Sequence, residues 1–454
     1  MSVTGRIIAS LALLGVSSFP AIAADAPLTA DRAVQMALQN NSQIISASAG
    51  ILDARGGLYG SLSGVLPQVS AGLSRSGSWT RDQRGIQIVG GGFTVRSNTD
   101  RYESYSTQPT LSGSWNALNL SSLSGVWAAR SSLRSAAWQR ASARNEVALL
   151  ARRQFYEVVK AVRLVGVSTS ALQLARDNGR RVQTLFDVGS VSRSDVLRAQ
   201  VNTNQAVLDS ITAQQSVLVQ RASLASLIGL EESKLGEVDT VLSVSPQSFD
   251  EASLLAEAAA NRPDLKAASD ALRAARASMW AARLQRVPYV TASGSVAFKP
   301  FSSSKSTGVD EAGVPFEVSG RNEASRQLSG RVALNWDLFD GLATDAGNAQ
   351  ARARLMRAQD AYDVLQRELR SGVHEAVITY EQALAGEATA SAARASALEN
   401  LKLIQQKYNV GSATILDLID AQVQLQRAES QEVSALAAIR VAEAQVQRAR
   451  GRLE

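Results

Sequence analysis

Alternating apolar and polar positions predict two pairs of strands. In residues 68–79 the apolar residues Val69, Ala71, Leu73 and Trp79 alternate with serine, glutamine and glycine, interrupted by Arg75. The segments 105–115, 290–298 and 328–336 show the same alternation. An apolar face for lipid and a polar face for water is typical of a transmembrane barrel strand, although a soluble two-sided sheet gives the same pattern. The polar, Gly/Ser-rich stretches 81–100 and 301–322 are expected to be long exposed loops.

Helical patterns are predicted on either side of each strand pair, and the long ones that follow each pair contain no proline. Pro67 and Pro288 end the first helix of each set, because proline lacks a donor and disfavours helix in the residue before it. The longest helices are roughly 65 residues, or about 100 Å at 1.5 Å per residue. Gly189 and Gly411 supply the left-handed residue that ends them. The expected helices are 29–65, 121–185 and 192–228, then 249–286, 342–407 and 414–452.

The sequence contains an internal repeat. LPQVSAGLS and VPYVTASGS contain Pro67 and Pro288, and SGSWNALN and ALNWDLFD contain Trp115 and Trp336; both pairs are 221 residues apart (288 − 67 and 336 − 115). FDVGSVSRSDVLRAQ and YNVGSATILDLIDAQ follow in the same order. Such self-similarity indicates a tandem duplication. The predicted repeats are residues 24–245 and 246–454, with β-hairpins at 67–119 and 288–339.

The first residues have the three parts of an export signal. Arg6 precedes the apolar run 7–16, and Ala21-Ile22-Ala23 form a cleavage site, so residues 1–23 are expected to be removed. No cysteine follows for N-terminal lipidation. Beyond this segment no unbroken run approaches the ~18 apolar residues of a spanning helix, so a membrane would be entered by strands.

Composition excludes several classes of site. The chain has no cysteine and one histidine, His374, which argues against thiolate chemistry, a metal cluster or a Ser-His nucleophile. No catalytic, cofactor or metal site is predicted, and His374 is expected to be structural rather than a ligand. The net charge of +6 comes without a basic-aromatic patch, so no nucleic-acid partner is predicted.

Four strands cannot close a membrane barrel, because the smallest barrels have about eight and an unpaired edge cannot lie in lipid. At least two chains must therefore share one barrel, and three would give about twelve strands. The predicted fold class is a mixed α/β membrane protein, with a shared barrel continued by long helices.

Several segments resemble the TolC family of outer-membrane channel-tunnel proteins. They are LTADRAVQMALQNNSQI and FDEASLLAEAAANRPDL, LPQV and VPYV, WDLFDG, and the twin turns FDVGSVSRSDVL and YNVGSATILDLIDA. Two positions depart from the family: Ser42 replaces the proline seen at Pro263, and WNALNL lacks the Phe-Asp-Gly of the second repeat.

The resemblance implies a homotrimer with a twelve-stranded barrel in the outer membrane and an α-helical tunnel in the periplasm. It implies a periplasmic adaptor and an inner-membrane transporter, of ABC or RND type, as partners. The expected function is a passive exit duct, with type I protein secretion favoured by WDLFDG and the missing lipidation cysteine. The alternatives are multidrug efflux and, from another class, a structural trimeric coiled-coil surface protein; an enzyme is a distant third.

The resemblance also places a gate at the twin turns, where Asp417 and Asp420 share a helical face and three copies would form an acidic ring. Tyr408, Asp195 and Ser194 match gate partners, whereas the usual arginine falls at Ala413; whether Arg193 replaces it stays open. Helix capping explains Asp417 and Asp195 equally well, through Thr414-x-x-Asp417 and Ser192-x-x-Asp195. The predicted adaptor-contacting tips are Gly189, Ser190, Val191, Gly411, Ser412 and Ala413.

Overall fold

The computed structural model describes residues 27–89, 92–299, 302–309 and 314–452. The predicted export signal, residues 1–23, lies outside them. The chain divides into two compact units. Unit 1 contains residues 27–41, Val147–Ser248 and Ile378–Gln445, and unit 2 contains Ser42–Glu146, Phe249–Val377 and the C-terminal residues from Val446.

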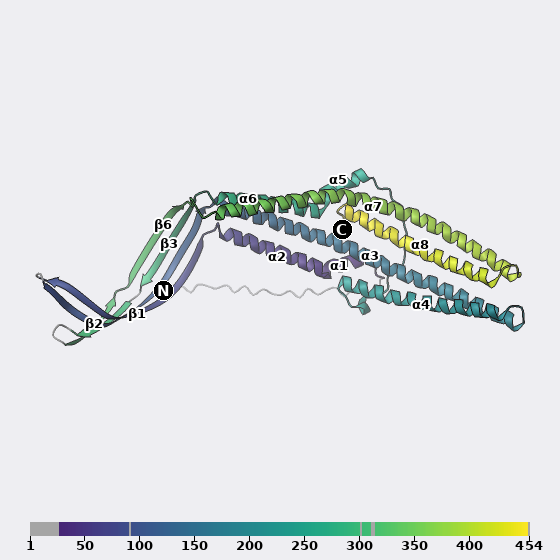
Figure 1. Cartoon of the computed structure of the whole chain (residues 1–454), viewed down its shortest axis with the longest axis horizontal. Helices are drawn as coiled ribbons and strands as arrows, with labels where there is room; N and C mark the ends of the chain where they lie inside the picture. Colours follow the sequence, from purple (N-terminus) through teal and green to yellow (C-terminus); the bar gives the residue numbers. More distant parts are fainter. Residues whose placement is uncertain (1–26, 90–91, 300–301, 310–313, 453–454) are drawn as a thin grey trace, which may run out of the picture. The chain divides into compact units, whose positions relative to one another are not determined.

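Unit 2 contains one antiparallel sheet (Figure 1). Its strands are β1 (Gln68–Val89), β2 (Gly92–Leu118), β3 (Tyr289–Lys299), β4 (Ser302–Val309), β5 (Pro315–Asn322) and β6 (Ser325–Asn335). β2 pairs with β1 on one side and with both β3 and β4 on the other. β6 then pairs with β3, and β5 pairs with β4. Among the described ladders β1 therefore forms one edge of the sheet, and β5 and β6 form the other.

The expectation of loops at 81–100 and 301–322 is wrong. The β1–β2 ladder continues to Val89 and Gly92, and Ser302 pairs with Asn322 at the start of the β4–β5 ladder. These segments lack an alternating apolar face, but backbone hydrogen bonds hold a ladder without one. The described sheet also has six strands rather than four. β3 and β4 pair with successive parts of β2, so they occupy one strand position between them.

One face of the sheet, called the outer face below, carries the predicted apolar band. Val69, Leu73, Leu328 and Val332 are about three-quarters exposed in the single chain. At one end of this band, the indole N–H of Trp115 donates to the Val65 carbonyl oxygen at 2.8 Å. Trp336 donates to the Arg286 carbonyl oxygen at 3.2 Å in the same way. Both tryptophans thus tie a strand to the end of the preceding helix.

The helices follow the predicted order, with most ends within three residues of expectation. They are α1 (Ala30–Asn40), α2 (Ser42–Ser63), α3 (Leu120–Asp187), α4 (Arg193–Ile228), η1 (Glu232–Lys234), α5 (Glu251–Asn261), α6 (Pro263–Leu284), α7 (Ala343–Asn409) and α8 (Ile415–Ala449). In unit 1, α3 and α4 lie side by side up to a short turn, and so do α7 and α8 (Figure 1).

The first helix expected in each repeat is instead two helices. Arg262 leaves the helical conformation because Pro263 follows it. In the first repeat Ser42 stands in place of that proline, yet the helix also breaks, at Asn41 (φ −69°, ψ 133°). There the Asn40 and Asn41 side-chain amides donate to the carbonyl oxygens of Ile228 and Leu227 at the end of α4. Both repeats therefore break at the same place. A following proline imposes the break at Arg262, whereas the break at Asn41 has no proline and coincides with tertiary hydrogen bonds.

One helix in the described part of the chain, α3, contains a stretch long and apolar enough to cross a membrane by composition alone. The expectation from the sequence concerned uninterrupted apolar runs, and this stretch does not contradict it, because charged residues such as Lys160 and Arg163 interrupt α3. Val158 and Val159 of α3 are fully buried, but only 28% of the apolar stretch is buried in the single chain.

Gly229 ends α4 in the left-handed conformation (φ 72°), with a Cβ position only 2.8 Å from Cβ of Asn40. Gly236 is also left-handed (φ 59°), but no atom lies within 4 Å of its Cβ position. We expect Gly229→Ala to lower the free energy of unfolding by about 1–3 kcal/mol more than Gly236→Ala, because only the former forces overpacking. Urea unfolding followed by circular dichroism measures this difference, and equal losses would contradict it.

Candidate functional site

Two turns at the ends of the paired helices carry all the predicted site residues. Gly189 (φ 78°) and Gly411 (φ 76°) adopt the predicted left-handed conformation. In each turn the following serine N–H reaches back five residues, from Ser190 to the Leu185 carbonyl oxygen (2.8 Å) and from Ser412 to that of Lys407 (2.9 Å). These bonds satisfy carbonyl groups at the helix ends. The tip residues Gly189, Ser190, Gly411 and Ser412 are exposed, and Val191 and Ala413 are half-buried.

Both turns continue into a capping box, as the sequence predicts. Ser192 accepts from the Asp195 N–H at 3.3 Å, and the Asp195 carboxylate accepts from the Ser192 N–H at 3.1 Å. Thr414 and Asp417 form the same pair of bonds at 3.2 and 2.8 Å. The Thr414 hydroxyl also donates to the Asp417 carboxylate, and together with the Thr414 N–H it lowers the pKa of Asp417. Asp195 and Asp417 are therefore helix caps, whatever further role they have.

The lowered pKa of Asp417 predicts a pH dependence of stability. The carboxylate form is favoured in the folded protein, so this stabilisation is complete above the unfolded pKa of about 4 and is lost as pH falls through the folded value. We expect acidification from about pH 6 to about pH 3 to lower the unfolding temperature less in Asp417→Asn than in the parent chain. Circular dichroism at both pH values measures this, and equal losses would show that the Asp417 bonds do not contribute.

Asp420 lies one turn beyond the Thr414 capping box. Its side chain is exposed, as is that of Asp417, so the acidic face predicted at the start of α8 is open to solvent in the single chain. No described residue pairs with Asp420. Capping accounts for Asp417 but leaves Asp420 without a structural role in the single chain.

Tyr408 lies between the two helix pairs. Its ring packs against a cluster formed by Val182 of α3, Val196 of α4 and Ile415 of α8. The Tyr408 hydroxyl is buried and has no hydrogen-bond partner among the described residues. Burial raises its pKa, and the nearby charges of Arg181 and Asp195 act on it in opposite directions. Within one chain, the predicted gate residues Asp195 and Ser194 bond to Ser192 rather than to Tyr408.

The arginine at this turn is one that sequence reasoning missed. Arg181 of α3 donates to the Asn409 side-chain oxygen at 2.7 Å, which links the two helix pairs beside Tyr408. Arg193 instead lies over the ring of Phe186, with its guanidinium carbon 5.8 Å from the ring centroid. Arg181 lies before the turn motif, so comparing the turn with the family, which places the usual arginine at Ala413, does not identify it. The signal that could have identified Arg181 is its position near the end of α3, shortly before the turn.

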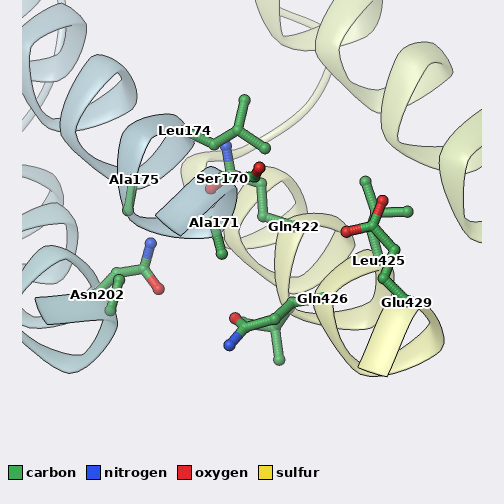
Figure 2. Close-up of a pocket in the computed structure, with 11 residues that line it drawn as sticks. Ser170, Ala171, Leu174, Ala175, Asn202, Gln422, Leu425, Gln426 and Glu429 are labelled. Atoms are coloured by element: carbon green, nitrogen blue, oxygen red, sulfur yellow. The ribbon is translucent and has the colours of Figure 1, made fainter. Parts of the chain in front are cut away.

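A small cavity lies further along the helices, between the α3–α4 pair and α8 (Figure 2). Figure 2 shows the amides of Asn202 and Gln426 extending into the same region from opposite walls. The Gln422 side-chain oxygen is buried without a partner among the described residues. The volume of about 80 Å³ is enough for a few water molecules. The two helix pairs thus enclose here a small cavity lined by both polar and apolar side chains.

The remaining candidate groups lie away from the turns. In unit 2, Nδ1 of His374 lies 3.2 Å from the Glu251 carboxylate, and both side chains are exposed. No group of three or more metal-ligating side chains occurs in the part of the chain that the structure describes.

A family model described as outer membrane efflux protein matches residues 33–230 and 254–452 of the chain. The chain is 26% identical over 273 residues to nodulation protein T of Rhizobium leguminosarum bv. trifolii. That match covers 57% of this chain and 53% of the relative, so it spans about half the length of the relative.

Solved structures share the fold over almost the whole chain. A membrane protein from Pseudomonas aeruginosa is 21% identical with a TM-score of 0.76, covering 93% of this chain and 90% of that one. The outer membrane channel CmeC of Campylobacter jejuni is 16% identical with a TM-score of 0.74, covering 93% and 85%. These similarities show a channel-type fold with a helical part and a sheet part.

Proposed function

The chain belongs to the outer membrane efflux protein family, and we propose that three copies of it form a passive exit duct of a tripartite export system. The family consists of channels rather than enzymes, and the chain is a protein of the outer membrane that extends into the periplasm. In the proposed assembly the three sheets close one barrel, and the helices line a tunnel toward a periplasmic adaptor and an inner-membrane transporter. The transporter supplies the energy.

The observation that carries this proposal is an open sheet with an apolar outer face. β1 and the β5–β6 side each leave an edge without a ladder among the described residues. The roughly three-quarters exposure of Val69, Leu73, Leu328 and Val332 supports a lipid-facing sheet rather than a soluble one. In lipid an unpaired edge leaves backbone groups unsatisfied, each at a cost of several kcal/mol. Edge-to-edge pairing between copies removes both edges.

The helices support the same assembly. Along α4, Leu197, Val201, Leu208, Ile211 and Leu218 form one exposed stripe with the heptad spacing of a coiled coil. The opposite side of α4 is already packed in its own chain, with Val196, Ala199, Ala206 and Leu224 buried. α7 exposes small residues on one face, Ala385, Thr389, Ala392 and Ser396. We propose that the large side chains on α4 of one copy pack against the small face on α7 of the next.

We propose that the two turns close the tunnel and contact the adaptor. Tyr408, Asp195, Ser194, Asp417 and Asp420 are the proposed gate residues. The proposed adaptor contacts are the tips that contain Gly189 and Gly411. The exposed tips and the buried, unpartnered Tyr408 hydroxyl support these roles. We further propose that the chain arose by tandem duplication, with its repeats at 24–245 and 246–454; the separate family matches to each half support this.

Two classes of cargo are compatible with this duct. Type I protein secretion is the reading favoured by WDLFDG. Small-molecule efflux is supported by the description of the family model that the chain matches. The duct mechanism is common to both, so the assignment depends on what accumulates in cells that lack it.

Two measurements test the function. The purified protein is expected to insert into planar bilayers as a trimeric, conducting channel, and a soluble monomer without conductance would overturn the proposal. A deletion strain is then assayed for secreted proteins and for drug susceptibility. Loss of a secreted protein at unchanged susceptibility assigns secretion, and increased susceptibility with an intact secretome assigns efflux. Complementation with the parent gene is the control.

A further inference from the structure

The inner face of the sheet carries rows of hydroxyl groups at one end. Ser70, Ser112, Ser295 and Ser329 lie in register across β1, β2, β3 and β6. The hydroxyl oxygens of Ser70 and Ser112 are 2.7 Å apart, and those of Ser295 and Ser329 are 2.8 Å apart. Both pairs line a hollow of about 610 Å³ on this face of the sheet. The next row across the same hollow is Gln68, Ser114, Ser293 and Arg331.

Within the described segments given next, the fixed charges on this face are positive. Arg331 and, further along, Lys299 are the charged residues that the strand register places here within 68–80, 102–118, 289–299, 302–308, 316–321 and 325–335. No carboxylate shares the face in those described segments. The acidic residues within these segments, Glu103 and Glu317, lie on the other face, where Glu103 pairs with Arg101 at 2.6 Å and Glu317 with Lys305 at 2.8 Å. Arg331 is exposed and has no such partner among the described residues.

We propose that this face forms an anion-favouring collar inside the barrel, with Arg331 as its selectivity-determining residue. The inference rests on the proposed trimer, which would place three guanidinium groups beside a ring of serine hydroxyls. Guanidinium stays protonated at all physiological pH values, and rings of Arg or Lys favour anions in pores. Hydroxyl groups donate hydrogen bonds to anions and carry no charge themselves. The class of solute favoured at this point carries a carboxylate or another anionic group.

This collar is opposite in sign to the turns that carry Asp417 and Asp420. Cargo would therefore meet an acidic ring and a basic ring in one duct. Because a carboxylate ring favours cations, it masks the selectivity of the barrel in measurements on the whole channel. A variant with both Asp417→Asn and Asp420→Asn isolates the contribution of the barrel.

The test measures the reversal potential of bilayer-inserted channels under a KCl gradient, in the Asp417→Asn, Asp420→Asn background. Salt near 0.01 M is used because the Debye length is then about 30 Å. Arg331→Gln is expected to lower the permeability ratio of chloride to potassium about twofold or more, since the ring's field reaches across the lumen at that screening length. Arg331→Glu is expected to invert the preference. The matched control is Arg326→Gln, which removes the same charge from the outer face of β6, where Arg326 lies 5.2 Å from the Phe298 ring.

Each outcome has one reading. A change with Arg331→Gln and none with Arg326→Gln supports the collar. Equal permeability ratios in the background, Arg331→Gln and Arg326→Gln channels overturn the collar while leaving the duct intact. An equal change in both variants also overturns it, because the effect would then follow net charge rather than the inner face. Absence of channels from the parent protein overturns the proposed function itself.

Discussion

Leu208→Glu combined with Ile211→Glu is expected to convert the protein from a trimer to a monomer. Both residues lie in the exposed stripe of α4, and each is half or more exposed in the single chain, so the change leaves the core of the chain intact. In the proposed trimer every interface would bury two carboxylates against the small face of α7. Removing an unpaired charge from water costs several kcal/mol per ion, and the three interfaces multiply this cost. Native mass spectrometry of the detergent-solubilised protein measures the oligomeric state.

The control for this prediction is Ser216→Glu. Ser216 is also exposed on α4, but it lies to the side of the heptad stripe. Ser216→Glu introduces the same residue, glutamate, on the same helix and should leave the trimer intact. Circular dichroism confirms that all variants retain their helices. A trimer that survives the double substitution would show that the α4 stripe is not an interface between copies.

The elements that could be predicted from the sequence are those with strong local signals. The ends of α3 and α7 follow from Gly189 and Gly411, whose left-handed conformation depends on little beyond the turn itself. The capping boxes at Ser192 and Thr414 follow from a four-residue motif, in which the aspartate lies three residues after the Ser or Thr. The inner halves of the strands follow from period-two alternation. These signals are local, so they need no knowledge of what packs nearby.

The features that the sequence did not predict depend on tertiary contacts. The outer half of β1 is polar throughout and continues as a strand because β2 is there to pair with it. The break at Asn41 coincides with amide hydrogen bonds to the end of α4, nearly 190 residues away in the chain. Arg181 reaches the site from outside the turn motif by its bond to Asn409. In each case, no sequence pattern near the residue concerned indicates the contact.

The proposed gate gives the second large expected effect, an increase in open probability in Tyr408→Phe. Within one chain this substitution removes a buried hydroxyl that has no described partner, so chain stability should be unchanged or slightly higher. In the proposed closed trimer, we expect this hydroxyl to bond to a group of the neighbouring copy. A hydrogen bond to a charged group contributes about 1.5–3 kcal/mol, so its loss should raise the ratio of open to closed channels on the order of tenfold.

Single-channel recording in planar bilayers measures this ratio, and Asp195→Asn provides the comparison. Asp195→Asn disturbs the Ser192 capping box as well as any contact between copies, so it should open the channel and also lower chain stability. Tyr380→Phe is the matched control, because Tyr380 is buried in the same unit, where its hydroxyl accepts from the Gln247 N–H at 3.0 Å. It should lower stability without changing open probability. If Tyr408→Phe leaves conductance unchanged at unchanged stability, the Tyr408 hydroxyl has no partner in the closed state, and the gate must be held by other residues.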